Sequence, residues 1–207
     1  MTSPLPALPL FKRILAVVAG ALAVAASAQL SVPVPGSPVP QSLQTLAVVV
    51  VGGVLGWGRG VAALLLYLCL GAGGLPVFAD GASGVERLLG STGGYLAGFV
   101  VGVGVAGWWT TRTASAGWGW QRTAPVLAAG FALCHVLILG MGWARLAIVL
   151  GAADAWSEGV APFLWGGAVK SVVAAGCVAG WRRWVGVPGP LAAGAGGWPV
   201  EPGPPTV

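Results

Sequence analysis

Long apolar runs, separated by short segments rich in proline, glycine or charge, dominate the hydrophobic pattern of this 207-residue chain. A helix of about 20 apolar residues spans the hydrocarbon core of a membrane, which is about 30 Å thick. The pattern therefore predicts about six transmembrane helices, of which the second and third are short. The runs lie at Phe11–Leu30, Leu43–Gly56, Gly60–Ala72, Gly93–Thr110, Thr123–Gly140 and Ala161–Trp181.

The remaining segments divide the chain into one domain and two tails. A weaker apolar stretch, Trp143–Leu150, is either an extension of the fifth helix or an interfacial segment. Residues 1–10 and 186–207 are rich in Pro, Gly and Ala and lack hydrophobic periodicity, which is typical of flexible tails. We therefore predict one six-helix membrane domain over residues 11–185.

The composition excludes a soluble globular protein. Hydrophobic residues make up 57% of the chain and charged residues only 7%, too few to cover a surface in water. The predicted fold class is an all-α integral membrane protein in contact with lipid. The net charge of +5 does not indicate binding to nucleic acid, because the basic residues are scattered rather than gathered in a stripe.

The positions of the basic residues predict the orientation of the helices. Cytoplasmic loops of membrane proteins carry an excess of Lys and Arg. With the N-terminus inside, seven of the ten basic residues fall on the cytoplasmic side, and only Arg87 and Arg145 fall outside. We therefore expect both termini in the cytoplasm and irregular loops outside. Ala26–Ala28 resembles a signal-peptide cleavage site, but the apolar run continues to Leu30, which favours a retained first helix.

Small residues recur along the first predicted helix. Ala16 and Gly20, and likewise Ala19 and Ala23, have the small-xxx-small spacing that lets another helix approach closely in lipid. This face is either an internal packing face or a docking face for a partner.

The sequence contains no recognisable catalytic or metal-binding motif. Gly102–Gly107 matches the G-x-G-x-x-G string, but no strand precedes it, so we interpret it as a glycine-rich packing face. His135 is the only histidine, and we favour a packing or hydrogen-bonding role over direct contact with a ligand. The three cysteines lack metal-ligand spacing and are expected to be small core residues. We expect no enzymatic activity, cofactor or metal.

Lys170 is the strongest candidate for chemistry. It lies about eight residues beyond Pro162, or roughly 12 Å along a helix. A cation within a membrane span needs a partner, and none of the predicted spans contains Asp or Glu. The pattern therefore indicates a ligand with a carboxylate. The alternative is that the side chain extends to the outer interface.

Several segments carry a specific combination of motifs. They are Val34–Leu46, Leu66–Leu68, Gly71–Ala79, Gly90–Phe99, Gly142–Trp143 and Gly159–Phe163, the last two of which lead to Lys170. Their order and spacing resemble those of the BioY family, the substrate-binding subunits of energy-coupling-factor (ECF) biotin transporters. The resemblance covers about Leu15 to Trp181.

The resemblance implies a six-helix protein of the bacterial cell membrane, with an outward-facing pocket that closes over biotin. It also implies partners. The first helices of such a subunit dock on a transmembrane coupling subunit that is driven by two cytoplasmic ATPases. Self-association into a homo-oligomer stays open.

The resemblance also suggests contacts with the ligand. The turn Thr92-Gly93-Gly94-Tyr95 would bring backbone donors and a polar ring to the pocket, or its glycines only turn the chain. Gln44 and Thr45 either hydrogen-bond the ureido ring of biotin or cap the second helix. Tyr67 is a pocket wall or an interfacial anchor.

One motif departs from the family pattern. The family usually reads Pro-Phe-x-Pro-Gly-Asp-x-x-Lys, whereas this chain has Trp165 in place of the second Pro and Gly167 in place of the acid. That acid is a natural acceptor for the ureido N–H groups. Another acceptor therefore replaces it, or the pocket binds another carboxylate-bearing vitamin, or the protein is a structural adaptor that has lost ligand binding.

Overall fold

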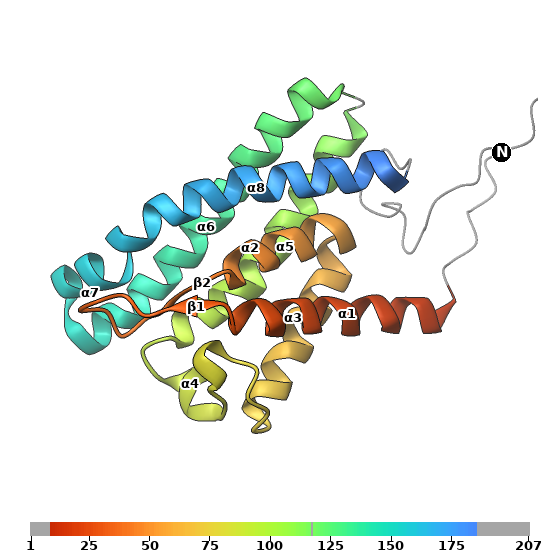
Figure 1. The fold of residues 1–207 in the computed structure, drawn as a ribbon. Coiled ribbons are helices and arrows are strands. Elements are labelled where there is room, and N and C mark those ends of the chain that lie inside the picture. Colours follow the sequence, from red (N-terminus) through yellow and green to blue (C-terminus); the bar gives the residue numbers. More distant parts are fainter. Residues whose placement is uncertain (1–8, 117, 186–207) are drawn as a thin grey trace, which may run out of the picture.

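The computed structural model describes residues 9–116 and 118–185, and these residues form a helical bundle with one small hairpin (Figure 1). The predicted tails lie outside the described residues, apart from Pro9 and Leu10. The elements are α1 (Leu10–Ala28), β1 (Ser31–Val32), β2 (Gln41–Ser42), α2 (Gln44–Leu55), α3 (Trp57–Ala72), the 3-10 turn η1 (Ala79–Gly81), α4 (Val85–Leu89), α5 (Gly93–Ser115), α6 (Trp120–Leu150), α7 (Ala152–Gly159) and α8 (Ala161–Val185).

Each of the six apolar runs forms a helix, as the hydrophobic pattern predicts. Trp143–Leu150 continues α6 without a break, so of its two interpretations the extension is correct. Among the described residues, three helices are long and apolar enough to cross a membrane: α1, α6 and α8. The helices α2 and α3 are apolar but shorter. The number of crossings and the orientation of the chain stay predictions.

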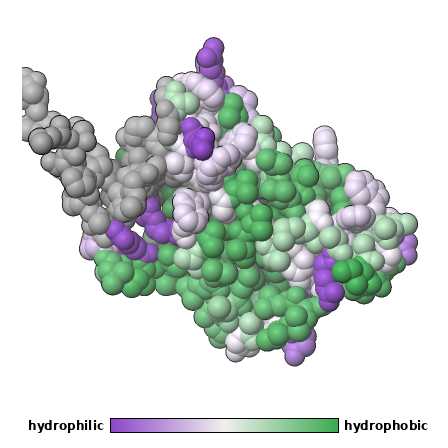
Figure 2. Space-filling model, turned by 180° about the vertical axis from the view of Figure 1, so that it is seen from behind, coloured by the Kyte–Doolittle hydropathy of each residue, from purple (hydrophilic) through white to green (hydrophobic). Residues whose placement is uncertain are grey.

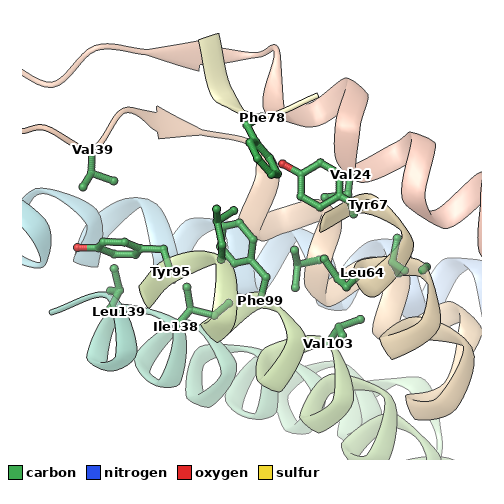
Figure 3. Packing of buried hydrophobic residues seen from close by; sticks show 14 of the residues in the cluster. Val24, Val39, Leu64, Tyr67, Phe78, Tyr95, Phe99, Val103, Ile138 and Leu139 are labelled. Atoms are coloured by element: carbon green, nitrogen blue, oxygen red, sulfur yellow. The ribbon is translucent and has the colours of Figure 1, made fainter. Parts of the chain in front are cut away.

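The helices pack in a fixed order around α5. This helix packs on α6, α2 and α3, while α8 covers α6 and α2, and α1 lies against α3 and α2. Two apolar clusters fill the space between them. One extends from α1 and α3 to α5 and α6 and includes Leu64, Phe99 and Ile138 (Figure 3), and the other joins α2 and α5 to α6 and α8 around Phe131.

Glycine allows the closest helix contacts. A Cβ atom on Gly52 of α2 would lie 2.4 Å from the carbonyl oxygen of Val103 on α5. A Cβ on Gly107 would lie 2.3 Å from the backbone nitrogen of Trp57. A Cβ on Gly102 would lie 2.9 Å from the side-chain atom Cδ1 of Ile138 on α6. The string Gly102–Gly107 is thus a helix packing face, as predicted.

The short helix α2 leaves part of the bundle to irregular chain. Its 12 residues span about 18 Å, whereas α6 spans about 46 Å. The β1–β2 hairpin precedes α2 and pairs Ser31 with Ser42. Ser31 donates a hydrogen bond to Asp80 at 2.5 Å, and Gln29 donates to the carbonyl of Phe78 at 3.2 Å, so the hairpin and the segment around η1 are joined.

The surface of the bundle is largely hydrophobic. Figure 2 shows apolar residues across the middle of one face, with hydrophilic residues toward its edges. Exposed apolar side chains include Leu15, Val136, Ile148 and Val172. This distribution suits contact with lipid. Cys134 is buried, but Cys69 and Cys177 are exposed, so the prediction of three core cysteines is wrong for these two.

The contact between α2 and α5 yields a prediction about stability. Gly52→Ala should lower the free energy of unfolding by about 1–3 kcal/mol, because the added methyl group meets a backbone oxygen that cannot move aside. The measurement is the melting temperature of the detergent-solubilised protein. Gly176→Ala on α8 is the matched control, because nothing lies within 4 Å of its Cβ position. Equal melting temperatures for the two variants would contradict the prediction.

Candidate ligand-binding cavity

A cavity of about 830 Å³, its open mouth included, lies at the end of the bundle that carries the hairpin and α4. Its wall is contributed by the hairpin, the segment from Phe78 to Arg87, and helices α2, α5, α6 and α8. Most of the wall is apolar, with Phe78, Leu96, Phe99 and Ile138 among its residues. The polar lining residues are Ser42, Gln44, Thr45, Arg87, Thr92, Tyr95, His135 and Lys170. An apolar cavity lined by a few polar groups is typical of a small-molecule site.

Lys170 lines the cavity and joins α8 to the start of α2. Its Nζ donates a hydrogen bond of 2.6 Å to the carbonyl oxygen of Ser42 and one of 3.4 Å to Thr45 Oγ1. Both acceptors are uncharged, and the structure pairs Lys170 with no carboxylate among the residues that it describes. The cation is therefore hydrogen-bonded but not neutralised.

Gln44 and Tyr67 form a buried pair behind the cavity wall. The Gln44 amide nitrogen donates to the Tyr67 hydroxyl, and the Tyr67 ring packs edge-on against Phe78 with 5.5 Å between centroids (Figure 3). Gln44 lines the cavity, whereas Tyr67 is fully buried and does not. The N-cap residue of α2 is Leu43, which makes no side-chain cap, and the Gln44 N–H donates a 3.3 Å hydrogen bond to the Ser42 hydroxyl. Gln44 and Thr45 are the first two residues of the helix, and the Gln44 amide nitrogen donates to Tyr67.

Of the four residues in the turn at the start of α5, two line the cavity and two serve packing. Thr92 and Tyr95 line the cavity, and the Tyr95 hydroxyl donates a 2.7 Å hydrogen bond to the Gly159 carbonyl. Gly93 and Gly94 do not line it. Their Cβ positions would lie 1.9 Å from the Leu88 oxygen and 2.4 Å from the Met141 oxygen respectively. These two glycines therefore allow a tight turn and close packing. This agrees with the alternative that they only turn the chain and do not contact the ligand.

Arg87 and His135 line the cavity but were not selected as ligand contacts from the sequence. Arg87 lies on α4, is exposed, and has no side-chain partner among the described residues. The one feature of the sequence that could have indicated a role for Arg87 is that it is one of only two basic residues in the predicted outer loops. The other, Arg145, instead donates to the carbonyls of Leu89 and Gly90.

His135 is buried in the cavity wall, with 5% of its surface exposed. Its Nδ1 lies 2.9 Å from the Phe131 oxygen and 3.1 Å from Ser171 Oγ. The predicted hydrogen-bonding role is thus present on this side of the ring. Groups of three or more His, Cys, Asp or Glu that could hold a metal ion are absent from the described residues.

The small residues of α1 do not share one face. Gly20 is buried, and its Cβ position would lie 3.0 Å from Ala63 of α3, so it serves internal packing rather than docking. Ala19 and Ala23 are exposed, and Ala16 is half-buried. Of the four small residues predicted to dock on a partner, only Ala19 and Ala23 are therefore retained as candidates.

The sequence and the fold both have known relatives. Residues 2–187 match the model of the BioY family. The biotin transporter BioY of Thermotoga maritima is 38% identical over 142 residues, which cover 69% of this chain and 80% of that protein. The biotin transporter BioY of Rhizobium etli is 36% identical over 67% of this chain and 75% of that protein.

A solved structure shows the same fold at low sequence identity. It is the crystal structure of the S-component for biotin from an ECF-type ABC transporter. The two superimpose with a TM-score of 0.73 and 20% identity, over 84% of this chain and 92% of the other. Because the family model matches a range that includes every described residue, this chain belongs to the BioY family.

Proposed function

We propose that this protein is the biotin-binding subunit of an ECF-type importer in the bacterial cell membrane. The observation that supports this most strongly is the cavity, which combines apolar walls with two cations and a set of neutral hydrogen-bonding groups. The relatives are named as biotin transporters, so the protein is a transport subunit rather than an enzyme. It would capture biotin outside the cell and deliver it through a coupling module.

The chemistry of biotin fits the cavity. Biotin has an apolar bicyclic body, a cyclic urea with two N–H donors and a carbonyl acceptor, and a carboxylate on a flexible chain. The aromatic and aliphatic wall would pack on the body. The Gln44 amide, the Thr45 hydroxyl and the Lys170 ammonium group would bind the urea, with Tyr67 holding Gln44 in place. Thr92 and Tyr95 complete this wall.

The two cations would bind different ends of the ligand. A carboxylate loses less hydration at the mouth of the cavity than deep inside, and Arg87 is exposed there. A guanidinium also binds a carboxylate through two parallel hydrogen bonds. Lys170, which already donates to neutral oxygens, would donate to the urea carbonyl. This proposal replaces the expectation that Lys170 binds the carboxylate.

The methyl ester of biotin, which has no negative charge, separates these two roles. Arg87→Ala should weaken the binding of biotin roughly tenfold to a hundredfold and leave the binding of the ester unchanged. Lys170→Ala should weaken both ligands to a similar degree, because the urea is common to both. Dissociation constants are measured by calorimetry on the purified protein, with Arg122→Ala as the control. If Lys170→Ala affects biotin alone, Lys170 binds the carboxylate instead.

The same purified protein tests the proposed function itself. Biotin should raise the melting temperature, since a ligand that binds only the folded state stabilises it. Stabilisation by a different carboxylate-bearing vitamin, with none by biotin, would indicate the second transport function. No stabilisation by any of these vitamins would favour an adaptor role.

The proposed orientation places the cavity outside the cell and both termini in the cytoplasm. Its support is the distribution of basic residues. In a protein whose three cysteines are replaced by alanine, Ser83→Cys near α4 should react with a membrane-impermeant maleimide in intact cells. Ala116→Cys, after α5, should react only once the cells are opened. The reverse pattern of labelling would contradict this orientation.

The exposed pair on α1 is our proposed contact with the coupling subunit. Ala19 and Ala23 leave room for close helix approach, and Leu15 and Leu22 beside them are exposed. Ala19→Leu with Ala23→Leu should reduce the amount of coupling subunit that co-purifies with the protein, without changing its affinity for biotin. Ala168→Leu, an exposed site on α8, is the control. Equal co-purification of both variants would exclude this face.

A further inference from the structure

The only histidine of the chain has one satisfied and one unsatisfied ring nitrogen. His135 Nδ1 approaches two oxygen atoms, whereas Nε2 is buried and has no hydrogen-bond partner among the described residues. A buried polar atom without a partner costs free energy, and in an apolar setting that cost is not recovered from water. Nε2 could therefore form a hydrogen bond with a ligand, either as a donor or as an acceptor.

The hydrogen bonds made by Nδ1 determine whether Nε2 is a donor or an acceptor. The Phe131 carbonyl only accepts, so Nδ1 must carry a hydrogen to make that 2.9 Å contact. The Ser171 hydroxyl donates its own hydrogen to the Gly167 carbonyl at 2.7 Å, which leaves its oxygen to accept from Nδ1. A neutral ring with its hydrogen on Nδ1 has a lone pair on Nε2. Lys170 lies in the same cavity wall, and its charge disfavours a second cation beside it.

The two edges of the ring face different surroundings. The Nδ1 edge faces Ser171, which does not line the cavity. On the other side of the ring, the atoms Cβ, Cγ and Cδ2 are the ones nearest to Gly167, and both Gly167 and His135 line the cavity. A Cβ atom on Gly167 would lie 3.6 Å from Cδ2 and 3.5 Å from the His135 Cβ, in ordinary contact. Position 167 therefore has no side chain that could meet a ligand beside the His135 ring.

We infer that His135 Nε2 accepts a hydrogen bond from a urea N–H of biotin, and so replaces the carboxylate that the family pattern places at position 167. This inference rests on the proposed function and assigns the acceptor in that same site. It gives the urea both kinds of partner from two residues of the same cavity wall. Lys170 donates to the carbonyl oxygen, and His135 accepts from the nitrogen. It also gives His135 the direct ligand contact that the sequence did not favour.

Two substitutions of His135 separate the nitrogen atoms. His135→Asn keeps an amide N–H near the Nδ1 position but has no atom near Nε2. Biotin affinity should fall roughly tenfold to a hundredfold, because a urea N–H is then buried without an acceptor. His135→Gln places an amide oxygen near the Nε2 position and should keep most of the affinity. Equal affinity of wild type and His135→Asn would overturn the inference.

Restoring the acid provides a rescue experiment. Gly167→Asp in the His135→Asn background should recover most of the lost affinity, because the Cβ fits and the carboxylate supplies the missing acceptor. Failure of this rescue, together with equal losses in the Asn and Gln variants, would show that His135 acts only in packing. Melting temperatures without ligand show whether each variant is folded.

Nitrogen NMR tests the wild-type protein directly. Because the chain has one histidine, labelling with 15N-histidine gives the two ring signals of His135 alone. Saturating biotin should shift the Nε2 signal toward lower frequency, as a lone pair that accepts a hydrogen bond does, while Nδ1 changes little. An unchanged Nε2 signal in protein that binds biotin would overturn the inference and leave the proposed function intact. Protein that does not bind biotin would overturn both.

Discussion

Direct backbone contact between α2 and α5 is the constraint on which the rest of the structure depends. Lipid chains are as apolar as the side chains of the helices, so apolar residues alone do not drive the helices together. Close packing does, and at Gly52 and Gly107 the backbone atoms of neighbouring helices occupy the space of a side chain. The Gly52 contact fixes the short helix α2 beside α5, with its first turn at the cavity, and the Gly107 contact fixes the junction between α2 and α3.

The shortness of α2 helps to explain why the cavity lies beside the start of this helix. A helix of about 18 Å does not cross a hydrocarbon layer of about 30 Å. If α2 lies within the membrane, the irregular chain before it would fill the remaining depth, where a polar backbone must be covered by protein or line a cavity. The Ser42 carbonyl meets this condition by accepting from Lys170, so one hydrogen bond joins α8, the hairpin and α2.

The charge of the cavity follows from a single residue. With glycine at position 167, the described lining residues include Arg87 and Lys170 but neither Asp nor Glu. A ligand with one carboxylate would compensate one of these two cations, while the other, Lys170, donates to neutral oxygen atoms. Gly167 contacts the His135 ring and both residues line the cavity, so the departure from the family motif and the proposed acceptor belong to the same part of the wall.

The sequence by itself determined the six helical runs, the packing role of Gly102–Gly107 and the unusual position of Lys170. These depend on apolar content and on charge along the chain, which the order of residues contains. Only the tertiary structure showed that Gly20 packs inside the bundle, that Tyr67 lies behind Gln44, and that Arg87 and His135 reach the cavity. Lipid and protein interior are both apolar, so hydrophobicity does not distinguish a residue facing one from a residue facing the other. That distinction comes from which helices pack together.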